Sequence, residues 1–387
     1  MNNGRSLLGV DHWLTSSPRT IIVQPTSLCP LACTYCYLPQ RHLKQYMTPA
    51  VAAAIAADIE PNWPPLEVVW HGGEPLAVGP RRLVALLEPF EPLRRAGRVQ
   101  HKVQTGSTLI TDAWCELFER YEIGVGVSID GPRSANHHRV DRADRPIFDR
   151  IVAGVETLKR HGIPFIVLAV VSRDGTHRAG DVLDFLRDLG CRWVGFNIEA
   201  REGANALGDT PTLENARRFW RDTFAWCQQN RDVTVREVQR LLGFLGLEPA
   251  VRAADAQHDL IPTIAWNGDV VLLSPELLGV TDVAYHDFVA GNVIMDTLPT
   301  ILRRAGDLRY VREFLVGLER CKATCEFFAY CQGAHAGDRY FEHGTFTATE
   351  TDHCRTSVQA TVLALADLVE GEETDDGSGM ACGHRHG

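Results

Sequence analysis

Short apolar runs alternate with longer amphipathic stretches along the first half of the chain. The apolar and β-branched runs predict strands at residues 20–24, 66–70, 99–104, 123–129, 165–171 and 193–198. The stretches between them have helical spacing and predict helices at residues 48–57, 80–87, 112–120, 148–161 and 179–189. Strands of about six residues separated by helices of about ten are typical of βα units on a parallel sheet.

The number of βα units predicts an incomplete barrel. Six units fit between residues 18 and 230, which is fewer than the eight of a complete barrel. We therefore expect an α/β protein with a partial (β/α)6 barrel of the TIM type. Beyond residue 205 the pattern weakens into two helices, 212–228 and 233–245, followed by short strands within 264–273. The expected parts are an N-terminal extension (1–17), the barrel (18–230), a bridging segment with a second domain (231–369) and a flexible acidic, His-rich tail (370–387).

Charge and composition narrow the classes of partner. The formal net charge is −10 and no dense run of Lys or Arg occurs, which argues against a nucleic-acid partner. The first residues do not form a secretory signal, and no apolar stretch approaches the roughly 20 residues of a membrane span. We therefore expect a cytoplasmic protein without a membrane partner. In that reducing compartment, 11 cysteines indicate metal or redox chemistry rather than a disulfide framework.

A first group of cysteines directly follows the first predicted strand. Cys29, Cys33 and Cys36 place three thiols within eight residues. Thiolates are the ligands of iron–sulfur clusters, and three of them can hold three corners of a cubic cluster while leaving the fourth iron open to a small molecule. The spacing differs from the paired knuckles of a zinc ribbon and from a bacterial ferredoxin run. A zinc site is the alternative interpretation.

With Tyr35 just before the third cysteine, this loop resembles the signature of the radical S-adenosylmethionine (SAM) superfamily. The resemblance implies that the three cysteines bind a 4Fe–4S cluster. It also implies that the open iron holds the amino and carboxylate groups of SAM, whose reductive cleavage gives methionine and a 5′-deoxyadenosyl radical.

Later motifs fall at the carboxyl ends of strands, where the working loops of a parallel sheet converge. The segment Gly72-Gly73-Glu74-Pro75 resembles the family's turn that receives the methionine amino group, with Glu74 as one acceptor. Its alternative is an ordinary strand-to-helix turn.

Four further residues are implied as SAM contacts. Ser128 and Asp130 lie in a segment similar to the one that reaches the ribose, and Arg139 stands where relatives place an Arg against the methionine carboxylate. A turn with a surface salt bridge is the alternative. Asn197, after the sixth strand, is placed to touch the adenosine or to act as an ordinary loop residue.

One motif departs from the family's pattern. Gln104 begins a segment that resembles the family's Gln-Thr-Asn-Gly, which faces substrate in relatives. Gly106 replaces the Asn, so no role is carried over from that Asn.

A second group of cysteines, Cys321, Cys325, Cys331 and Cys354, offers four thiols, enough to enclose a 4Fe–4S cluster. It resembles the SPASM extension of radical SAM enzymes, whose usual pattern holds two auxiliary clusters. Residues 264–274 contain no cysteine and His335 stands where another is expected. We therefore expect one auxiliary 4Fe–4S cluster, with a four-cysteine zinc site as the alternative. In the tail, Cys382, His384 and His386 offer ligands for a metal, but a disordered tail is the favoured interpretation.

The SPASM resemblance implies an enzyme that modifies a ribosomally made precursor peptide, with an external flavodoxin- or ferredoxin-type electron donor. Among reactions we favour a crosslink from an aromatic side chain to a β-carbon, as in the cyclophane-forming maturases that the chain resembles. Thioether formation, epimerisation and sulfatase maturation are alternatives, as is a non-catalytic iron–sulfur redox protein. Asp130 and Glu276 are candidate bases, and no N-terminal leader-binding domain is expected because the first strand starts near Thr20.

Overall fold

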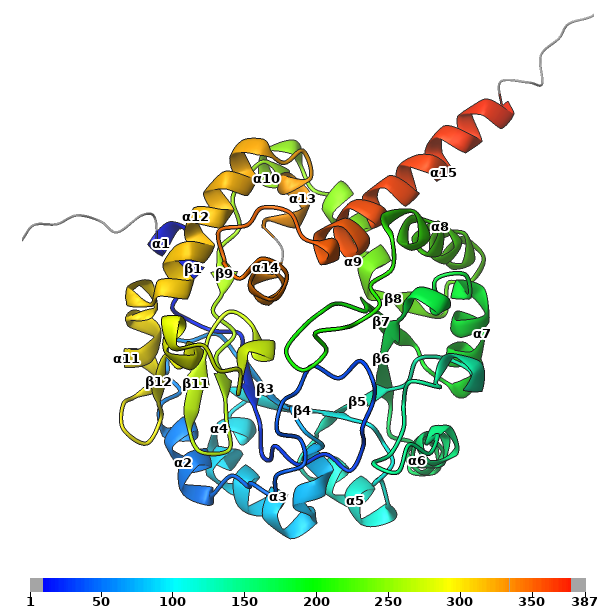
Figure 1. Ribbon diagram of the computed structural model, residues 1–387. Helices are drawn as coiled ribbons and strands as arrows, with labels where there is room; N and C mark the ends of the chain where they lie inside the picture. Colours follow the sequence, from blue (N-terminus) through cyan, green and yellow to red (C-terminus); the bar gives the residue numbers. More distant parts are fainter. Residues whose placement is uncertain (1–9, 334, 377–387) are drawn as a thin grey trace, which may run out of the picture.

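A computed structural model describes residues 10–333 and 335–376 (Figure 1). Its centre is a parallel sheet whose strands confirm all six sequence predictions, with no end differing by more than one residue. The strands are β2 (Thr20–Val23), β3 (Leu66–Trp70), β4 (Val99–Thr105), β5 (Gly124–Ser128), β6 (Phe165–Val171) and β7 (Trp193–Ile198). Each pairs in parallel with the next, so their carboxyl ends share one rim.

Helices surround the outside of this curved sheet, as a partial (β/α)6 barrel requires (Figure 1). They are α2 (Pro49–Ala57), α3 (Pro80–Leu87), α4 (Glu91–Arg95), α5 (Asp112–Arg120), α6 (Phe148–Arg160), α7 (Ala179–Leu189) and α8 (Leu213–Gln229). Burial alternates along the strands: in β3, Leu66, Val68 and Trp70 are buried while the residues between them are less so. One face of the sheet is therefore packed, and the other lines the barrel interior.

The C-terminal half extends the same sheet. Strand β8 (Thr234–Val235) pairs with β7, and β10 (Thr263–Ile264) pairs in parallel with β2 at the opposite edge. Strands β11 (Asp269–Val271) and β12 (Gly291–Asn292) follow in antiparallel order. Both expected domains, 18–230 and 231–369, thus contribute to one ten-stranded sheet. Strand β10 covers the backbone edge of β2, which would otherwise be open to pairing with another chain.

The N-terminal segment and the remaining helices complete the molecule. Helix α1 (Val10–Trp13) leads into β1 (Leu14–Thr15), which pairs with β9 (His258–Asp259) in a small second sheet. The later helices are α9 (Arg236–Leu245), α10 (Pro249–Arg252), α11 (Leu298–Arg303), α12 (Arg309–Thr324), α13 (Phe328–Cys331), α14 (Ala336–His343), the π-helical turn η8 (Cys354–Gln359) and α15 (Ala360–Asp376).

Helix α15 includes the first residues of the expected tail. It packs along α8, where the Arg217 Nε donates to Asp367 at 2.6 Å, and its far end projects from the body (Figure 1). The tail residues Cys382, His384 and His386 lie outside the described residues.

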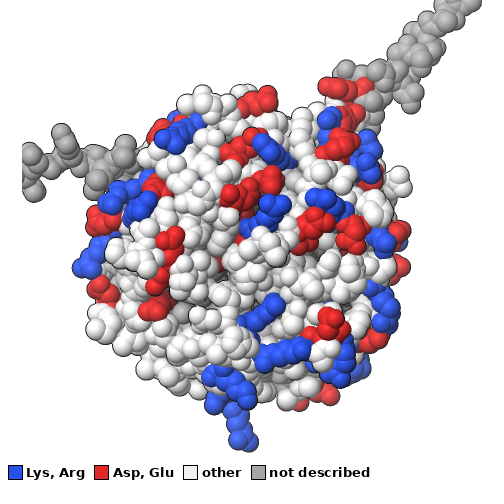
Figure 2. Space-filling view, in the orientation of Figure 1, with Lys and Arg blue, Asp and Glu red and all other residues white. Residues whose placement is uncertain are grey.

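Acidic and basic side chains are interspersed on the face shown in Figure 2, without a broad basic patch. Within residues 10–333 and 335–376, no helix is both long enough and apolar enough to cross a membrane.

Candidate functional site

The first cysteine group lies in the loop between β2 and α2, on the rim formed by the carboxyl ends of the strands. Its backbone is held by two arginines: Arg41 donates to the Cys33 carbonyl at 3.0 Å, and Arg142 donates to the Cys29 carbonyl at 2.6 Å. Cys29, Cys33 and Cys36 all have free thiols. The loop is therefore shaped by backbone contacts, and its three sulfur atoms are available for ligand binding.

The chemistry of these thiols fits an iron–sulfur cluster. Burial raises the pKa of Cys29 and Cys33, and nearby Arg139 partly offsets the effect on Cys33. Cluster binding must therefore displace protons from these thiols. Three thiolates in one short loop can hold three corners of a cubic iron–sulfur core.

The Gly-Gly-Glu-Pro turn after β3 lies directly against the cysteine loop. The Glu74 amide donates to the Leu28 carbonyl at 2.9 Å. Gly73 has a φ of +66°, and a Cβ at this position would lie 2.5 Å from the Thr26 carbonyl oxygen and 2.8 Å from that of Leu28. Only glycine allows this approach, because any side chain would push the turn away from the loop.

We expect Gly73→Ala to destabilise the protein by about 2–4 kcal/mol, because backbone strain and a backbone clash add together. Gly79→Ala is the matched control: its φ is +81°, but a Cβ there has nothing within 4 Å, so only the strain of about 1 kcal/mol remains. Denaturant unfolding and bound iron would be measured for both variants. Equal stability of the two would show that the close approach has no energetic role.

Glu74 is buried, and its carboxylate accepts hydrogen bonds from neighbouring strand ends. Its side chain is 2% exposed, and its carboxylate accepts from Thr105 Oγ1 at 2.7 Å and from the amides of Leu76 and Gly106 at 3.1 and 2.9 Å. The carboxylate thus joins the ends of β3 and β4 inside the protein. These contacts hold the turn in place, and the SAM contacts expected of Gly72, Gly73, Glu74 and Pro75 stay a prediction.

Three of the predicted contact residues lie on the inner face of the barrel. Gln104 Nε2 donates to Ser128 Oγ at 2.8 Å across β4 and β5, and Gly126 leaves room for the Gln104 side chain. Asn197 is exposed on β7 and accepts from Arg236 at 2.9 Å. Gln104 and Ser128 are therefore in contact, whereas Asn197 lies two strands further along the sheet.

Asp130 and Arg139 form a buried ion pair. Arg139 donates through Nε and Nη2 to the two Asp130 oxygens at 2.9 and 2.8 Å. Asp130 also accepts from the Tyr35 hydroxyl at 2.5 Å and from the Val170 amide at 2.8 Å. The pair therefore connects the cysteine loop to β5 and β6. With its carboxylate so engaged, Asp130 is not supported as a free base or a ribose ligand, and Arg139 has two of its three nitrogens occupied.

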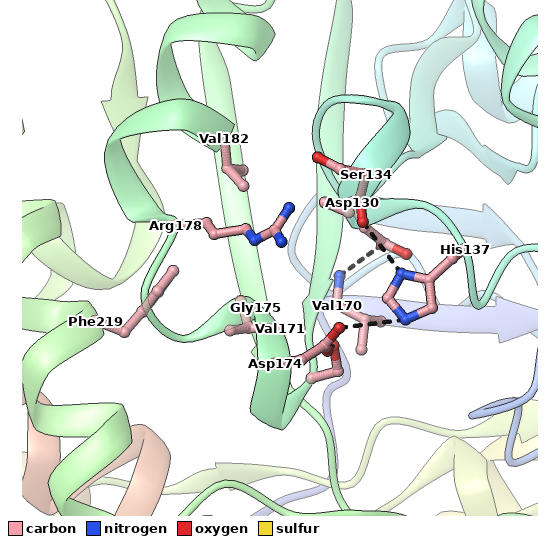
Figure 3. A pocket seen from close by; sticks show the side chains of 12 residues that line it. Asp130, Ser134, His137, Val170, Val171, Asp174, Gly175, Arg178, Val182 and Phe219 are labelled. Atoms are coloured by element: carbon pink, nitrogen blue, oxygen red, sulfur yellow. Dashed lines mark hydrogen bonds and ion pairs between the residues drawn. The ribbon is translucent and has the colours of Figure 1, made fainter.

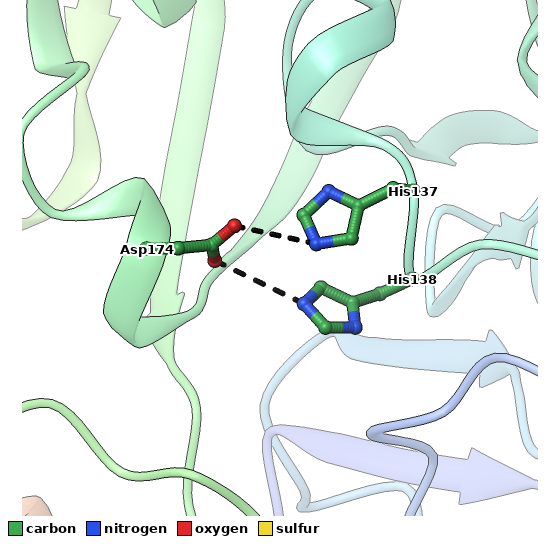
Figure 4. A group of neighbouring side chains, drawn as sticks. All are labelled: His137, His138 and Asp174. Atoms are coloured by element: carbon green, nitrogen blue, oxygen red, sulfur yellow. Dashed lines mark ion pairs between the residues drawn. The ribbon is translucent and has the colours of Figure 1, made fainter.

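A pocket beside this ion pair lies between the loops that follow β5 and β6 (Figure 3). His137 and His138 direct their Nε2 atoms toward Asp174, at 3.3 and 3.9 Å (Figure 4). The Nδ1 atom of His138 lies 2.8 Å from the Thr34 hydroxyl in the cysteine loop. The three side chains are 29–55% exposed, so their ion pairs are weak in water.

The second cysteine group also converges in space. Cys321 lies in the last turn of α12, Cys325 directly follows that helix, Cys331 ends α13 and Cys354 begins η8, and all four line one pocket. Four thiols on one pocket can enclose a 4Fe–4S cluster or hold a single zinc ion.

A buried arginine supports this pocket. Arg339 is 2% exposed, donates to the Gly333 carbonyl at 2.6 Å and lies 3.5 Å from the Cys321 sulfur. Burial raises the pKa of Cys321, and the positive charge of Arg339 offsets part of that rise, which helps to stabilise the thiolate that a cluster needs.

Between the two cysteine groups lies a set of polar residues that sequence reasoning mostly missed. The members are Tyr37, His71, Glu202, Ser274, Glu276, His335, Asp338 and His353. Burial and neighbouring carboxylates raise the pKa of Glu202, and mainly burial raises that of Asp338, to about 7. Only Glu276 and His335 were singled out from the sequence. The spacing of His335 and Asp338, three residues apart, was the one available signal.

Comparison with known proteins agrees with this geometry. The model of the radical SAM superfamily matches residues 23–178. An uncharacterised protein of Synechocystis, sll1766, is 33% identical over 384 residues, covering 94% of this chain and 95% of its own length. A serine-type anaerobic sulfatase-maturating enzyme of Klebsiella aerogenes is 31% identical over 56% of this chain, and the match spans 58% of that enzyme.

A solved structure has the same fold. Native anSMEcpe with bound AdoMet and Cp18Cys peptide superposes with a TM-score of 0.72 at 19% identity, covering 92% of this chain and 99% of its own. Fold, cysteine loop and family match thus agree: the chain belongs to the radical SAM superfamily, enzymes that use SAM and a 4Fe–4S cluster.

Proposed function

We propose that this enzyme modifies a ribosomally made peptide by joining an aromatic side chain to the β-carbon of a nearby residue. The observation that carries the proposal is the convergence of four cysteines on one pocket, in addition to the three of the catalytic loop. Such a crosslink removes two hydrogens from the peptide, so an electron acceptor is needed besides the radical. A peptide substrate is also supported by the peptide bound to the anSMEcpe structure.

We propose Cys29, Cys33 and Cys36 as ligands of the catalytic cluster and Cys321, Cys325, Cys331 and Cys354 as ligands of one auxiliary 4Fe–4S cluster. When bound, these groups and SAM supply the 5′-deoxyadenosyl radical and an acceptor for the second electron. The inner face of the barrel around Gln104, Ser128 and Asn197 is the proposed place for the cofactor's nucleoside. A flavodoxin or ferredoxin remains the proposed donor.

Glu276 is the proposed proton acceptor of the reaction. Among the side-chain hydrogen bonds found in the described residues, its carboxylate has one from the Ser274 hydroxyl at 2.5 Å. Burial raises the pKa of Tyr37, and the charges of Glu276 and of Cys36 in the catalytic loop raise it further. Burial lowers the pKa of His71, and the charge of Glu276 partly offsets that effect. Glu276 therefore faces the catalytic loop from the C-terminal region, whereas Asp130 is held by Arg139.

Maturation of a sulfatase serine is the second candidate, favoured by the similarity to the Klebsiella enzyme. Both reactions remove two hydrogens, so mass alone does not distinguish them. The products differ chemically: a matured sulfatase carries an aldehyde, whereas a crosslink is inert to hydrazides and blocks fragmentation between the joined residues.

The test is anaerobic turnover with peptides encoded by short reading frames beside the gene, and with a serine-containing sulfatase peptide. We expect loss of two hydrogens from an aromatic-containing peptide, an interrupted fragment series and no hydrazide adduct. A hydrazide-reactive product only from the sulfatase peptide would replace crosslinking by sulfatase maturation. A product whose mass is unchanged in ordinary water, but which takes up one deuterium in heavy water, would indicate epimerisation instead.

A further inference from the structure

We propose that Glu202, His335 and Asp338 bind one divalent metal ion of the Mn²⁺ or Fe²⁺ type, separate from both cysteine groups. Glu202 lies in the loop after β7, and the other two residues lie at the start of α14. Figure 1 shows α14 end-on in the middle of the view, next to that loop. One ligand atom from each residue lies within 4.8 Å of the other two.

The independent observation concerns the buried carboxylate of Asp338. Asp338 is 1% exposed, and neither of its oxygens accepts a hydrogen bond from an N–H group or a hydroxyl among the described residues. Its neighbours are the imidazoles of His335 and His353 at 3.6 Å and the Glu202 carboxylate, with which it can share only a proton or a cation. The Nδ1 atom of His335 is likewise buried and without a hydrogen bond, 3.6 Å from Asp338. Buried polar groups are normally satisfied, and a buried charge needs a counter-charge. A cation between the three side chains satisfies all of them together.

The distances fit such an ion. Metal bonds of about 2.1 Å to nitrogen and oxygen place neighbouring ligand atoms roughly 3.0–3.4 Å apart. The 3.6 Å separation of His335 and Asp338 requires only a small closure. Two carboxylates and an imidazole form a donor set without sulfur, which suits Mn²⁺, Fe²⁺ or Zn²⁺ and differs from the thiol sets elsewhere in the chain.

The surroundings supply support and access. The Nδ1 atom of His353, the residue directly before η8, lies 3.6 Å from Asp338. The Glu342 carboxylate accepts hydrogen bonds from the amides of Asp352 and His353. A cavity lined by Arg201, Glu202, Gly203, Phe341, Glu342 and Asp352 lies beside the site. It gives a path from solvent to Glu202. His335 also stands where the SPASM resemblance predicts a cysteine, so a different metal centre at this place explains that departure.

The test uses the full-length protein with its iron–sulfur sites filled, because vacant thiols also bind metals. Mn²⁺ is titrated in, and the EPR signal of the unbound ion reports binding. We expect one site in the parent protein and at least tenfold weaker binding in Asp338→Asn and in Glu202→Gln. Asp174→Asn is the matched control: it alters the exposed group of His137, His138 and Asp174 (Figure 4), and we expect unchanged binding.

Several results would overturn the proposal. The first is absence of Mn²⁺ binding to the parent protein, which would mean that the two carboxylates share a proton instead. The second is unchanged binding in both site variants. The third is loss of binding in Asp174→Asn alone. Iron content is measured in every variant to verify folding. If Asp338→Asn does not fold, Glu202→Gln decides the question, because Glu202 lies in a loop and is only partly buried.

Discussion

Cys33→Ala is expected to abolish formation of 5′-deoxyadenosine from SAM. Cys33 is one of three thiols in the catalytic loop, so its loss leaves two protein ligands for the proposed cluster. The decrease should exceed the roughly 100-fold typical of outer-shell partners, because a direct ligand is removed. The measurement is anaerobic turnover with dithionite, with 5′-deoxyadenosine quantified by chromatography.

Cys227→Ala is the matched control for this variant. Cys227 carries a free thiol on α8, outside both cysteine groups, and its loss should leave cleavage at the parent rate. If Cys33→Ala, freed of adventitious iron, also retained the parent rate, the assignment of the loop would be wrong.

For Cys325→Ala we expect cofactor cleavage to continue while the yield of modified peptide falls by about tenfold or more. Cys325 lines the second thiol pocket and has no place in the catalytic loop. The variant should also lose about half of its iron, since one of two 4Fe–4S clusters loses a ligand. The ratio of 5′-deoxyadenosine to peptide product is the decisive quantity.

Two outcomes would count against the role of the second pocket. An unchanged product yield would remove it from the reaction. Zinc in place of iron in the parent protein would show that the four thiols form a structural zinc site.

The barrel was predictable because each central strand is a distinct apolar run. The run Phe165–Val171 is a strand with the expected bounds, and the helices after it also appear where expected. The edge strands were not predictable. β8 and β10 have two residues each, too short for any periodicity. Residues 233–245 were read as one helix, but the segment begins with β8 before α9 starts.

In the site, positions were more predictable than partners. The cysteine loop, the turn at Gly73 and the segments at Gln104 and Ser128 all lie at the carboxyl rim, because strand polarity fixes where loops emerge. Side-chain partners depend on the neighbours that folding supplies. Glu74 caps the turn and bonds across to Thr105, and Asp130 pairs with Arg139; no sequence spacing encodes either choice.

The three-residue site proposed for a metal ion illustrates the limit most clearly. Glu202 belongs to the loop after β7, whereas His335 and Asp338 belong to the C-terminal region. Only the tertiary fold places α14 against that loop. Sequence alone identified His335 as an unusual residue in a cysteine-rich segment, without its partners.

The central claim is that Cys29, Cys33 and Cys36 hold a cluster with one iron open to SAM. The most direct measurement is the EPR spectrum of the reduced cluster with and without SAM, recorded in Cys325→Ala so that the second pocket does not contribute. The account predicts that SAM shifts the spectrum and that 5′-deoxyadenosine forms on warming. An identical spectrum with and without SAM, or a loop filled by zinc, would contradict it.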